Sequence, residues 1–451
     1  MELENINRVY LIGVGGIGMS GLARYFKKRC ADVHGYDKTS TPLTDALQSE
    51  GISVIFLDEI DQLPAAFQKN DAGSLIIYTP AIPADSAILN YFRSFGFSLK
   101  KRSEVLGIIS KGMFTIAVAG THGKTTTSSI IAHLLKDSGY DCSAFLGGIA
   151  SNYNTNILFG ENDTMVVEAD EYDRSFLTLH PDIAIVTSMD ADHLDIYGDA
   201  AHLTESFQLF ASQVKEGGTL IKRKGLDLQD GQTYAANEDA DIQALNIRVE
   251  EGSFWFDFKN STTEIPDLQI ALPGIHNIEN ATAAIEVALR LKISVEKIRA
   301  ALSNFKGVKR RFEVLVKSES HIYIDDYAHH PEELRACITA VKSLYPEKKL
   351  TTIFQPHLFS RTRDFAEGFA EVLAMTDELI MLDIYPAREL PIEGVNSEMI
   401  MDKIAISDKK ILSKEATLNH IKNVMPELVL TVGAGDIDTL VKPIKNILEN
   451  A

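Results

Sequence analysis

Short apolar runs that end in glycine-rich or polar loops recur along this chain, and a helical pattern of apolar residues follows many of them. The first run, Arg8–Ile12, leads into a loop at residues 13–18. Apolar side chains then recur at intervals of three and four residues from Met19 to Phe26. A strand-like run followed by a helical period predicts a βα unit that packs on a sheet.

The same pattern returns in the middle and at the end of the chain, which predicts an α/β fold. Runs of this kind lie at residues 75–79, 115–119, 164–167, 183–187, 321–325, 350–354, 379–384 and 428–432. A length of 451 residues fits about three domains. We expect three in series, each a mostly parallel sheet with flanking helices. The expected order is a Rossmann-like domain at residues 1–107, a P-loop ATPase-like domain at 108–312 and a second Rossmann-like domain at 313–451. Around Trp255, polar segments predict a local excursion of antiparallel strands.

Composition and charge narrow the class of protein. The chain is 45% hydrophobic and 24% charged, which is typical of a globular protein. Its formal charge of -19 argues against an extended nucleic-acid or anionic-membrane surface, but not against local basic pockets. Three scattered cysteines suggest neither a disulfide framework nor a cysteine metal cluster. The acidic start lacks the basic region of a signal peptide, and no apolar run reaches membrane-spanning length. We therefore expect a cytoplasmic protein.

The segment at residues 115–127 is the strongest chemical signal. An apolar strand ends at Gly120, and a helical pattern starts near Lys124. Backbone N–H groups of such a loop can surround phosphates, while a lysine contacts the β/γ oxygens and a hydroxyl such as that of Thr125 binds Mg²⁺. The usual spacing would place a glycine at Val118, so this loop is a contracted variant.

The first loop carries a complete G-x-G-x-x-G pattern at residues 13–18, and Asp37 follows the next strand. On local pattern alone, a nicotinamide cofactor is the favoured ligand. The narrower inference is that a diphosphate binds at the N-terminus of the following helix.

Polar residues also follow two central strands. Glu168 ends one apolar run, and His193 lies shortly after another. Because parallel strands end at one edge of a sheet, Thr125, Glu168 and His193 could face one nucleotide and hold Mg²⁺ or Mn²⁺. The neighbouring Asp170, Glu171 and Asp173 fit a solvated acidic turn equally well. The segment at residues 273–280 initiates a helical run from Ala281 to Leu291, and its His276 and Asn280 fit capping and ligand contact equally well.

Taken together and in order, these motifs resemble the Mur ligases, ATP-dependent amino-acid ligases of peptidoglycan precursor synthesis. The resemblance covers all three expected domains and leaves only residues 225–265 unanchored. It rests on the motifs at residues 120–126, Asp192-His193, His276-Asn277 with Asn280, and residues 325–331. The glycine loop and the segments at residues 354–357 and 360–363 favour the branch that adds L-alanine to UDP-N-acetylmuramate. In this family the glycine loop holds the diphosphate of a UDP-sugar rather than a nicotinamide cofactor.

The resemblance implies roles for individual residues. Catalytic roles fall to Lys124, His193, His329 and Arg361. ATP contacts fall to Gly120, Thr121, His122, Gly123, Lys124, Thr125, Thr126, His276, Asn277, Asn280, Arg311 and Asp326. UDP-sugar contacts fall to Gly13, Gly15, Gly16, Ile17, Gly18 and Asp37. The amino acid is expected beside His329, His357 and Arg361. The expected metal ligands are Thr125, Glu168 and His193, since the family's spacing selects Glu168 rather than Glu171.

Two positions depart from the family pattern. Leu358 stands where the alanine-adding branch has an arginine, so one carboxylate contact is missing or Arg363 supplies it. No lysine lies between His193 and Lys215, so we expect no carbamoylated lysine, and the bridging of a second Mg²⁺ stays open.

Three other functions compete with this interpretation. A related ligase that attaches a recycled tripeptide to the same UDP-sugar would need a roomier amino-acid site. A non-catalytic nucleotide switch would leave the UDP-type loop and the third domain without a purpose. A dehydrogenase would leave the P-loop idle. The sequence makes no prediction of the oligomeric state.

Overall fold

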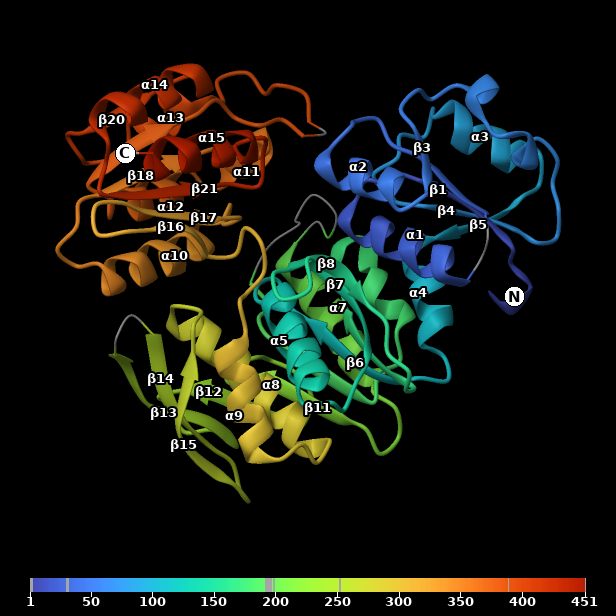
Figure 1. Ribbon diagram of the computed structural model, residues 1–451, viewed down its shortest axis with the longest axis horizontal. Helices are drawn as coiled ribbons and strands as arrows, with labels where there is room; N and C mark the ends of the chain where they lie inside the picture. Colours follow the sequence, from blue (N-terminus) through green and yellow to red (C-terminus); the bar gives the residue numbers. More distant parts are fainter. Residues whose placement is uncertain are drawn as a thin grey trace. The chain divides into compact units, whose positions relative to one another are not determined.

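The computed structural model describes residues 3–29, 32–190, 197, 199–250, 253–387 and 389–450. They form two compact units. The first comprises Met1–Leu245, Phe258–Ile265 and Glu279–Asn304, and the second comprises Asn246–Asp257, Pro266–Ile278 and Phe305–Ala451. The first unit contains the N-terminal sheet and most of the central sheet, and the second contains the C-terminal sheet and parts of strands β13 (Ile242–Glu250), β14 (Ser253–Lys259) and β15 (Glu264–Ile270) (Figure 1).

The N-terminal sheet has five parallel strands in the order β3-β2-β1-β4-β5. Its strands are β1 (Arg8–Ile12), β2 (Asp32–Tyr36), β3 (Ser53–Ile55), β4 (Ser74–Tyr78) and β5 (Ser98–Lys101). Its helices are α1 (Ile17–Arg29), α2 (Pro42–Ser49), α3 (Ala87–Ser94) and α4 (Arg102–Ser110). The strand order reverses between β1 and β4. Ligands of open parallel sheets bind at such a reversal, outside the carboxyl ends of the strands.

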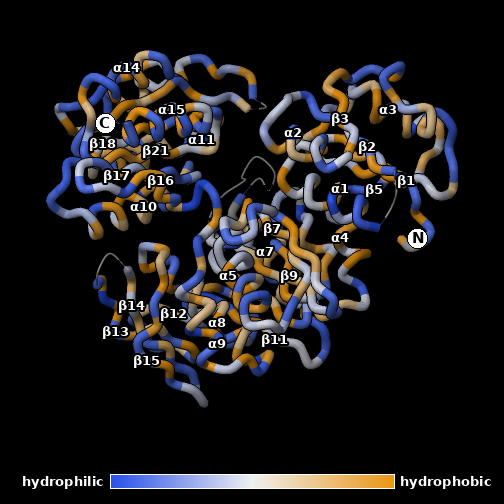
Figure 2. The backbone as a smooth tube through the Cα atoms, in the orientation of Figure 1, coloured by the Kyte–Doolittle hydropathy of each residue, from blue (hydrophilic) through white to orange (hydrophobic). Residues whose placement is uncertain are grey.

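Alternation along β1 explains how helices cover both faces of this sheet. Val9 and Leu11 point to a core cluster that contains α1 and α2 residues, whereas Tyr10 and Ile12 point to a second cluster with α3. A strand buried on both faces reads as a continuous apolar run, as the sequence of β1 does. Figure 2 shows such hydrophobic segments in the strands of the sheets.

The central sheet runs β12-β11-β10-β6-β9-β7-β8, and β13 joins β12 through residues 242–244. Pairing is parallel except between β7 and β8. The strands are β6 (Phe114–Ala119), β7 (Ser143–Ala150), β8 (Thr155–Leu158), β9 (Thr164–Glu168), β10 (Ile183–Val186), β11 (Thr219–Arg223), β12 (Gln232–Ala236) and β13 (Ile242–Glu250). The helices of this part of the chain are α5 (Lys124–Asp137), α7 (Ala200–Ser212), α8 (Ile275–Arg290) and α9 (Val295–Asn304). Strands β14 (Ser253–Lys259) and β15 (Glu264–Ile270) confirm strand structure around Trp255.

The C-terminal sheet runs β16-β17-β21-β18-β19-β20, with only β16 antiparallel to its neighbour. Its strands are β16 (Glu313–Lys317), β17 (Ile322–Asp326), β18 (Leu350–Phe354), β19 (Glu378–Met381), β20 (Lys409–Ile411) and β21 (Leu428–Val432). Residues of α10 (Pro331–Leu344), α12 (Ala366–Leu373) and α13 (Ser397–Met401) join one core cluster. A second cluster contains residues of α14 (Lys414–Val424) and α15 (Asp438–Glu449). The short α11 (Phe359–Asp364) follows β18.

Three mostly parallel sheets with flanking helices confirm the expected α/β class. The exact boundaries at residues 107 and 312 stay predictions. In the part of the chain that the structure describes, no helix is long and apolar enough to cross a membrane.

Helix α1 connects the N-terminal sheet to the central sheet. One core cluster contains Leu22 and Phe26 of α1 together with Phe145 of β7 and Ile157 of β8. Beside it, the buried amide of Asn156 donates to the backbone oxygen of Ile17 and to the hydroxyl of Ser20. It also accepts a hydrogen bond of 2.7 Å from Arg24. Apolar packing and one buried amide therefore fix the glycine-loop helix to the central sheet.

Replacing Asn156 by alanine should weaken this junction. Loss of a buried partner for the Ile17 oxygen and the Arg24 guanidinium costs about 1–3 kcal/mol. Each kcal/mol lost from the free energy of unfolding lowers the midpoint of thermal unfolding by roughly 2–4 °C in proteins of 150–250 residues, and by less in a longer chain. The matched control is Asn152→Ala, which removes a hydrogen bond of 2.8 Å at an exposed position. Equal midpoints for the two variants would contradict the proposed contribution of Asn156.

Candidate functional site

The loop between β6 and α5 contains two glycines with positive φ angles. Gly120 and Gly123 have φ angles of 139° and 80°, in the region that favours glycine. A Cβ on Gly120 would lie 2.1 Å from the Thr187 hydroxyl, and one on Gly123 would lie 2.8 Å from the Asn280 amide oxygen. Lys124, Thr125 and Thr126 form the first turn of α5, and both threonines are buried. Both glycines are therefore required by local geometry.

A pair of hydroxyls after β10 holds this loop in place, and the sequence analysis did not identify it. The Ser188 hydroxyl accepts from the His122 N–H at 2.7 Å and lies 2.9 Å from the Thr121 hydroxyl. Thr187 donates to the backbone oxygens of Ala119 and His122. Thr187-Ser188 directly follows a buried apolar strand, which is the one signal in the sequence that could have suggested this role.

The Lys124 ammonium is held by Glu171. Its Nζ lies 2.7 Å from a Glu171 carboxylate oxygen and also donates to the Gly120 carbonyl. The Glu171 side chain is only 1% exposed, so this acid does not belong to a solvated turn. Burial acts to lower the pKa of Lys124, but the charges of Glu171, Asp170 and Glu168 raise it above the usual value. The lysine therefore remains a cation beside the loop.

Glu168 ends β9, as expected for a residue at the carboxyl edge of the sheet. Its carboxylate accepts a hydrogen bond of 2.9 Å from the Gly147 N–H. His193, its expected partner in metal binding, lies outside the described residues. Among the residues that the structure describes, no three His, Cys, Asp or Glu side chains gather as a metal cluster.

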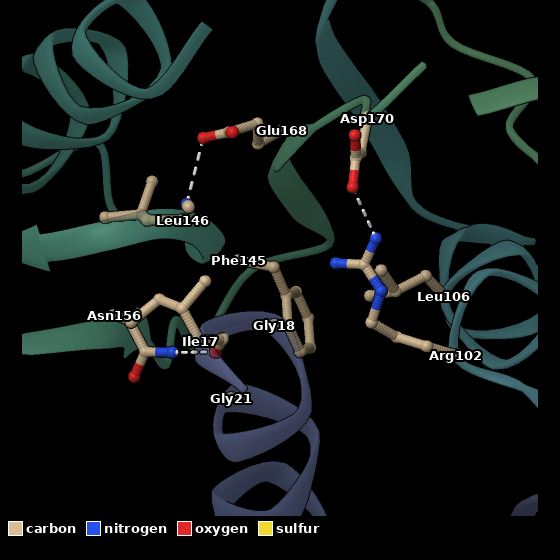
Figure 3. A pocket seen from close by; sticks show the side chains of 11 residues that line it. Ile17, Gly18, Gly21, Arg102, Leu106, Phe145, Leu146, Asn156, Glu168 and Asp170 are labelled. Atoms are coloured by element: carbon tan, nitrogen blue, oxygen red, sulfur yellow. Dashed lines mark hydrogen bonds and ion pairs between the residues drawn. The ribbon is translucent and has the colours of Figure 1, made fainter. Parts of the chain in front are cut away.

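A pocket between the start of α1 and the central sheet contains Glu168 (Figure 3). Its apolar wall comes from Leu106, Phe145 and Leu146, and its polar side chains are Arg102, Asn156, Glu168 and Asp170. Arg102 forms an ion pair of 2.8 Å with Asp170. The sequence analysis missed Arg102, and Asp170 is a partner of this arginine rather than part of a solvated turn.

The glycine loop itself is closed by local hydrogen bonds. Gly13 has a φ of 88°, and the Gly16 N–H donates to its carbonyl at 3.2 Å. The Gly15 N–H donates to the Asp37 carboxylate at 2.8 Å, so Asp37 stabilises the loop in this structure. Ile17 and Gly18 open α1, which leaves their N–H groups at the helix N-terminus.

The expected adenine-side residues lie in the first turns of α8. The Asn280 amide oxygen accepts a hydrogen bond of 3.0 Å from Thr127, which brings Asn280 to the phosphate loop. Asn277 is buried, and its amide donates to the Pro273 oxygen at 2.7 Å. Burial lowers the pKa of His276 to about 4; Glu333 opposes this shift and Arg311 adds to it. The imidazole is therefore neutral at pH 7.

In the second unit, the start of the C-terminal domain forms a network of charges. Asp325 accepts from Arg310 at 3.0 Å and from Thr431 at 2.6 Å. Asp326 accepts from the backbone N–H groups of Phe312 and Ala328 at 2.6 and 2.7 Å. Burial raises the pKa of Asp326 to about 6, although Arg311 and these hydrogen bonds act to lower it.

The three residues expected to bind the amino acid lie together in the second unit. The imidazole rings of His329 and His357 are 5.8 Å apart, and an Arg361 nitrogen lies 3.5 Å from the His357 ring. The Arg361 residue is buried, with an exposure of 7%. Arg363 points elsewhere, since it is exposed and pairs with Asp364 at 2.7 Å. Leu358, which stands at the position that departs from the family pattern, is also buried.

Family models match nearly the whole described chain. They are the Mur ligase family catalytic domain at residues 8–113, the Mur ligase middle domain at residues 118–288 and the Mur ligase glutamate ligase domain at residues 310–435. Curated UDP-N-acetylmuramate–L-alanine ligases from Cytophaga hutchinsonii and Flavobacterium psychrophilum are each 50% identical to it. They cover 100% of the chain, which in turn covers 98% and 100% of these relatives.

A solved UDP-N-acetylmuramate–alanine ligase from Thermotoga maritima superposes with a TM-score of 0.82 at 25% identity and covers 98% of each chain. A murein peptide ligase from Psychrobacter arcticus has a TM-score of 0.72 at 21% identity, with 98% of this chain and 99% of that one covered. The fold and the nucleotide loop thus define a three-domain α/β ligase. The chain belongs to the Mur ligase family.

The raised pKa of Asp326 predicts a pH-dependent stability. The ordinary pKa of an aspartate is near 4, so between about pH 4 and 6 the folded state binds more protons than the unfolded state. Stability contributed by this group is therefore lost as the pH rises through that window, by at most about 1.4 kcal/mol per pH unit. The Asp326→Asn variant cannot titrate there, although it loses one acceptor for the backbone.

Thermal unfolding of both proteins from pH 4 to 7 tests this prediction. The midpoint of Asp326→Asn relative to the natural protein should increase over this range, whatever its absolute value. A difference that stays constant with pH would show that Asp326 has an ordinary pKa.

Proposed function

We propose that this chain is an ATP-dependent ligase that joins L-alanine to the lactyl carboxylate of UDP-N-acetylmuramate, in peptidoglycan biosynthesis. The products are UDP-N-acetylmuramoyl-L-alanine, ADP and phosphate. The main support for this proposal is the full-length match at 50% identity to curated UDP-N-acetylmuramate–L-alanine ligases. The phosphate loop and the His329–His357–Arg361 cluster supply the chemistry that this reaction requires. We also propose a cytoplasmic location, which the three scattered cysteines favour.

The reaction has two steps. A lactyl carboxylate oxygen attacks the γ-phosphorus of ATP, ADP leaves, and an acyl phosphate forms. The free amine of alanine then attacks the acyl carbon, inorganic phosphate leaves, and the amine loses a proton. Phosphoryl transfer depends mainly on alignment and charge neutralisation. Lys124 supplies a fixed positive charge for the β/γ-phosphates, and the loop N–H groups supply donors.

Thr125 and Glu168 fit a magnesium site, and His193 completes the proposed set. The Thr125 hydroxyl and the Glu168 carboxylate supply oxygen atoms, which are the ligands that Mg²⁺ prefers. Mg²⁺ usually retains several water molecules and binds phosphate oxygens together with one or two carboxylates, so a small protein ligand set is sufficient. When bound, Mg²⁺ would neutralise phosphate charge. Mn²⁺ is an alternative with similar ligand preference.

A phosphate-release assay tests the proposed activity. We expect release only when UDP-N-acetylmuramate, ATP, Mg²⁺ and an amino acid are all present, with L-alanine preferred over a panel of amino acids. Preference for the peptide L-alanyl-γ-D-glutamyl-meso-diaminopimelate would instead identify a tripeptide ligase. Release without any acceptor would indicate an ATPase, and tight binding of NADH without the UDP-sugar would indicate a dehydrogenase.

A variant of Lys124 separates its function from its structural role. Lys124→Ala should lower turnover by orders of magnitude, but it also leaves the buried Glu171 carboxylate without its cation. Breaking a buried pair costs about 3–5 kcal/mol, so this variant should unfold at a lower temperature. The double variant Lys124→Ala/Glu171→Gln should recover much of the stability and remain inactive. A double variant that regains turnover would refute the role of Lys124 in phosphate binding.

Arg361 should hold the carboxylate of alanine. A charge-assisted hydrogen bond contributes about 1.5–3 kcal/mol, so Arg361→Lys, which keeps the charge and loses the planar fork, should raise the KM for alanine roughly tenfold or more. The KM values for ATP and the UDP-sugar should stay unchanged. Arg363→Lys is the matched control, because Arg363 is exposed and paired with Asp364. A raised KM in the control with none in Arg361→Lys would assign the role to the other arginine.

A further inference from the structure

Arg102 lies beside the start of α1, the helix that follows the glycine loop. It is the first residue of α4, and its side chain is 20% exposed. One guanidinium nitrogen, Nη2, is 2.8 Å from the Asp170 carboxylate. The other, Nη1, lies so close to Gly18 that a Cβ at that position would be 2.2 Å away (Figure 3). Only a glycine therefore leaves room for the arginine in this position.

The charge at this point is unusual for a helix N-terminus. The N-terminal end of an α-helix carries a partial positive charge, so acids are favoured and cations disfavoured there. The first turn of α1 contains no acidic residue, and the nearby Arg102 is a cation. Asp170 offsets this charge at Nη2. No described residue hydrogen-bonds Nη1, which faces the glycine. The partial positive charge at the N-terminus of α1 and the guanidinium of Arg102 therefore lie side by side, and an anion bound there would stabilise both.

We propose that Arg102 contacts the diphosphate of the UDP-sugar through Nη1, and that Asp170 positions it through Nη2. This inference rests on the proposed function. The Asp170 carboxylate is itself fixed, because its second oxygen accepts a hydrogen bond of 3.1 Å from the Tyr172 N–H. An arginine held at one edge loses less rotamer freedom when its other edge binds a phosphate.

This arrangement also connects two parts of the substrate site. Asp170 lies two residues after Glu168, which ends β9 in the same pocket. The residue that positions Arg102 and the proposed magnesium ligand are therefore carried by one short segment. We expect this segment to set the distance between the bound diphosphate and the reacting carboxylate.

Equilibrium binding without ATP tests the contact directly. The ligands are UDP-N-acetylmuramate and UDP-N-acetylglucosamine, which share the diphosphate but differ in the lactyl carboxylate. We expect Arg102→Gln to weaken both by a similar factor, roughly ten- to hundredfold, as for loss of a charge-assisted hydrogen bond. Arg102→Lys should recover part of this loss. The matched control is Lys100→Gln, which removes one positive charge two residues away, at a lysine paired with Glu104. The Lys100→Gln variant should bind both UDP-sugars as tightly as the natural protein does.

The outcomes separate this inference from the proposed function. If the natural protein binds neither UDP-sugar, the proposed function fails. If it binds and Arg102→Gln binds equally well, only the role of Arg102 fails. A loss confined to UDP-N-acetylmuramate would place the contact at the lactyl carboxylate and overturn the assignment to the diphosphate.

A double-mutant cycle tests the positioning role of Asp170. Asp170→Asn keeps an acceptor for Tyr172 and removes the charge that holds Arg102. We expect it to weaken UDP-sugar binding by a smaller factor than Arg102→Gln, with the KM for alanine unchanged. In the double variant the two losses should not add, because Asp170 acts through Arg102. Additive losses would mean that Asp170 acts independently and would refute the positioning role.

Discussion

The ammonium of Lys124 and the carboxylate of Glu171 are buried within 2.7 Å of each other. Taking one ion out of water costs several kcal/mol, so neither group could be buried here without the other. This constraint shapes the site, because a chain with a formal charge of -19 has to present cations to anionic substrates. The same solution recurs at Arg102–Asp170 and Arg310–Asp325. Each pair fixes the position of a cation, so that an acidic chain holds these positive groups at defined places.

Fixing the cations is useful only if the loops that carry them are also fixed. In the first unit, Thr187 and Ser188 hold the phosphate loop through its backbone, and Asn156 holds the start of α1. Both devices use buried polar groups whose partners are complete, which makes them specific as well as stabilising. Asn156 is buried beside the apolar packing of α1 on β7 and β8. The glycine loop and the phosphate loop therefore belong to one compact unit.

Local patterns in the sequence predicted what local geometry requires. The alternation of strands and helices and the helix that starts at Lys124 follow from neighbouring residues, and the structure confirms them. The partners of these elements could not be predicted in the same way. Glu171 is 47 residues from Lys124, Asp170 is 68 from Arg102, and Asn156 is 139 from Ile17. Such pairs depend on the order of strands in the sheet, which no local period reveals. For the same reason, the sequence left a solvated turn open as an equal alternative for Asp170 and Glu171, which the structure shows to be ion-pair partners.

The arrangement in the C-terminal domain is one that the proposed recognition of a small amino acid would require. Burial of the alanine methyl group contributes only about 0.8 kcal/mol, so affinity has to come from its charged ends. An arginine for the carboxylate is therefore more important than a shaped pocket, and Arg361 is the buried arginine beside His357. Leu358 does not weaken this arrangement by itself, because its side chain is directed into the protein interior. With Arg363 engaged by Asp364, the fork of Arg361 would determine both the affinity for the carboxylate and the direction of the amine. Selectivity against larger amino acids would then depend on the space around the two histidines.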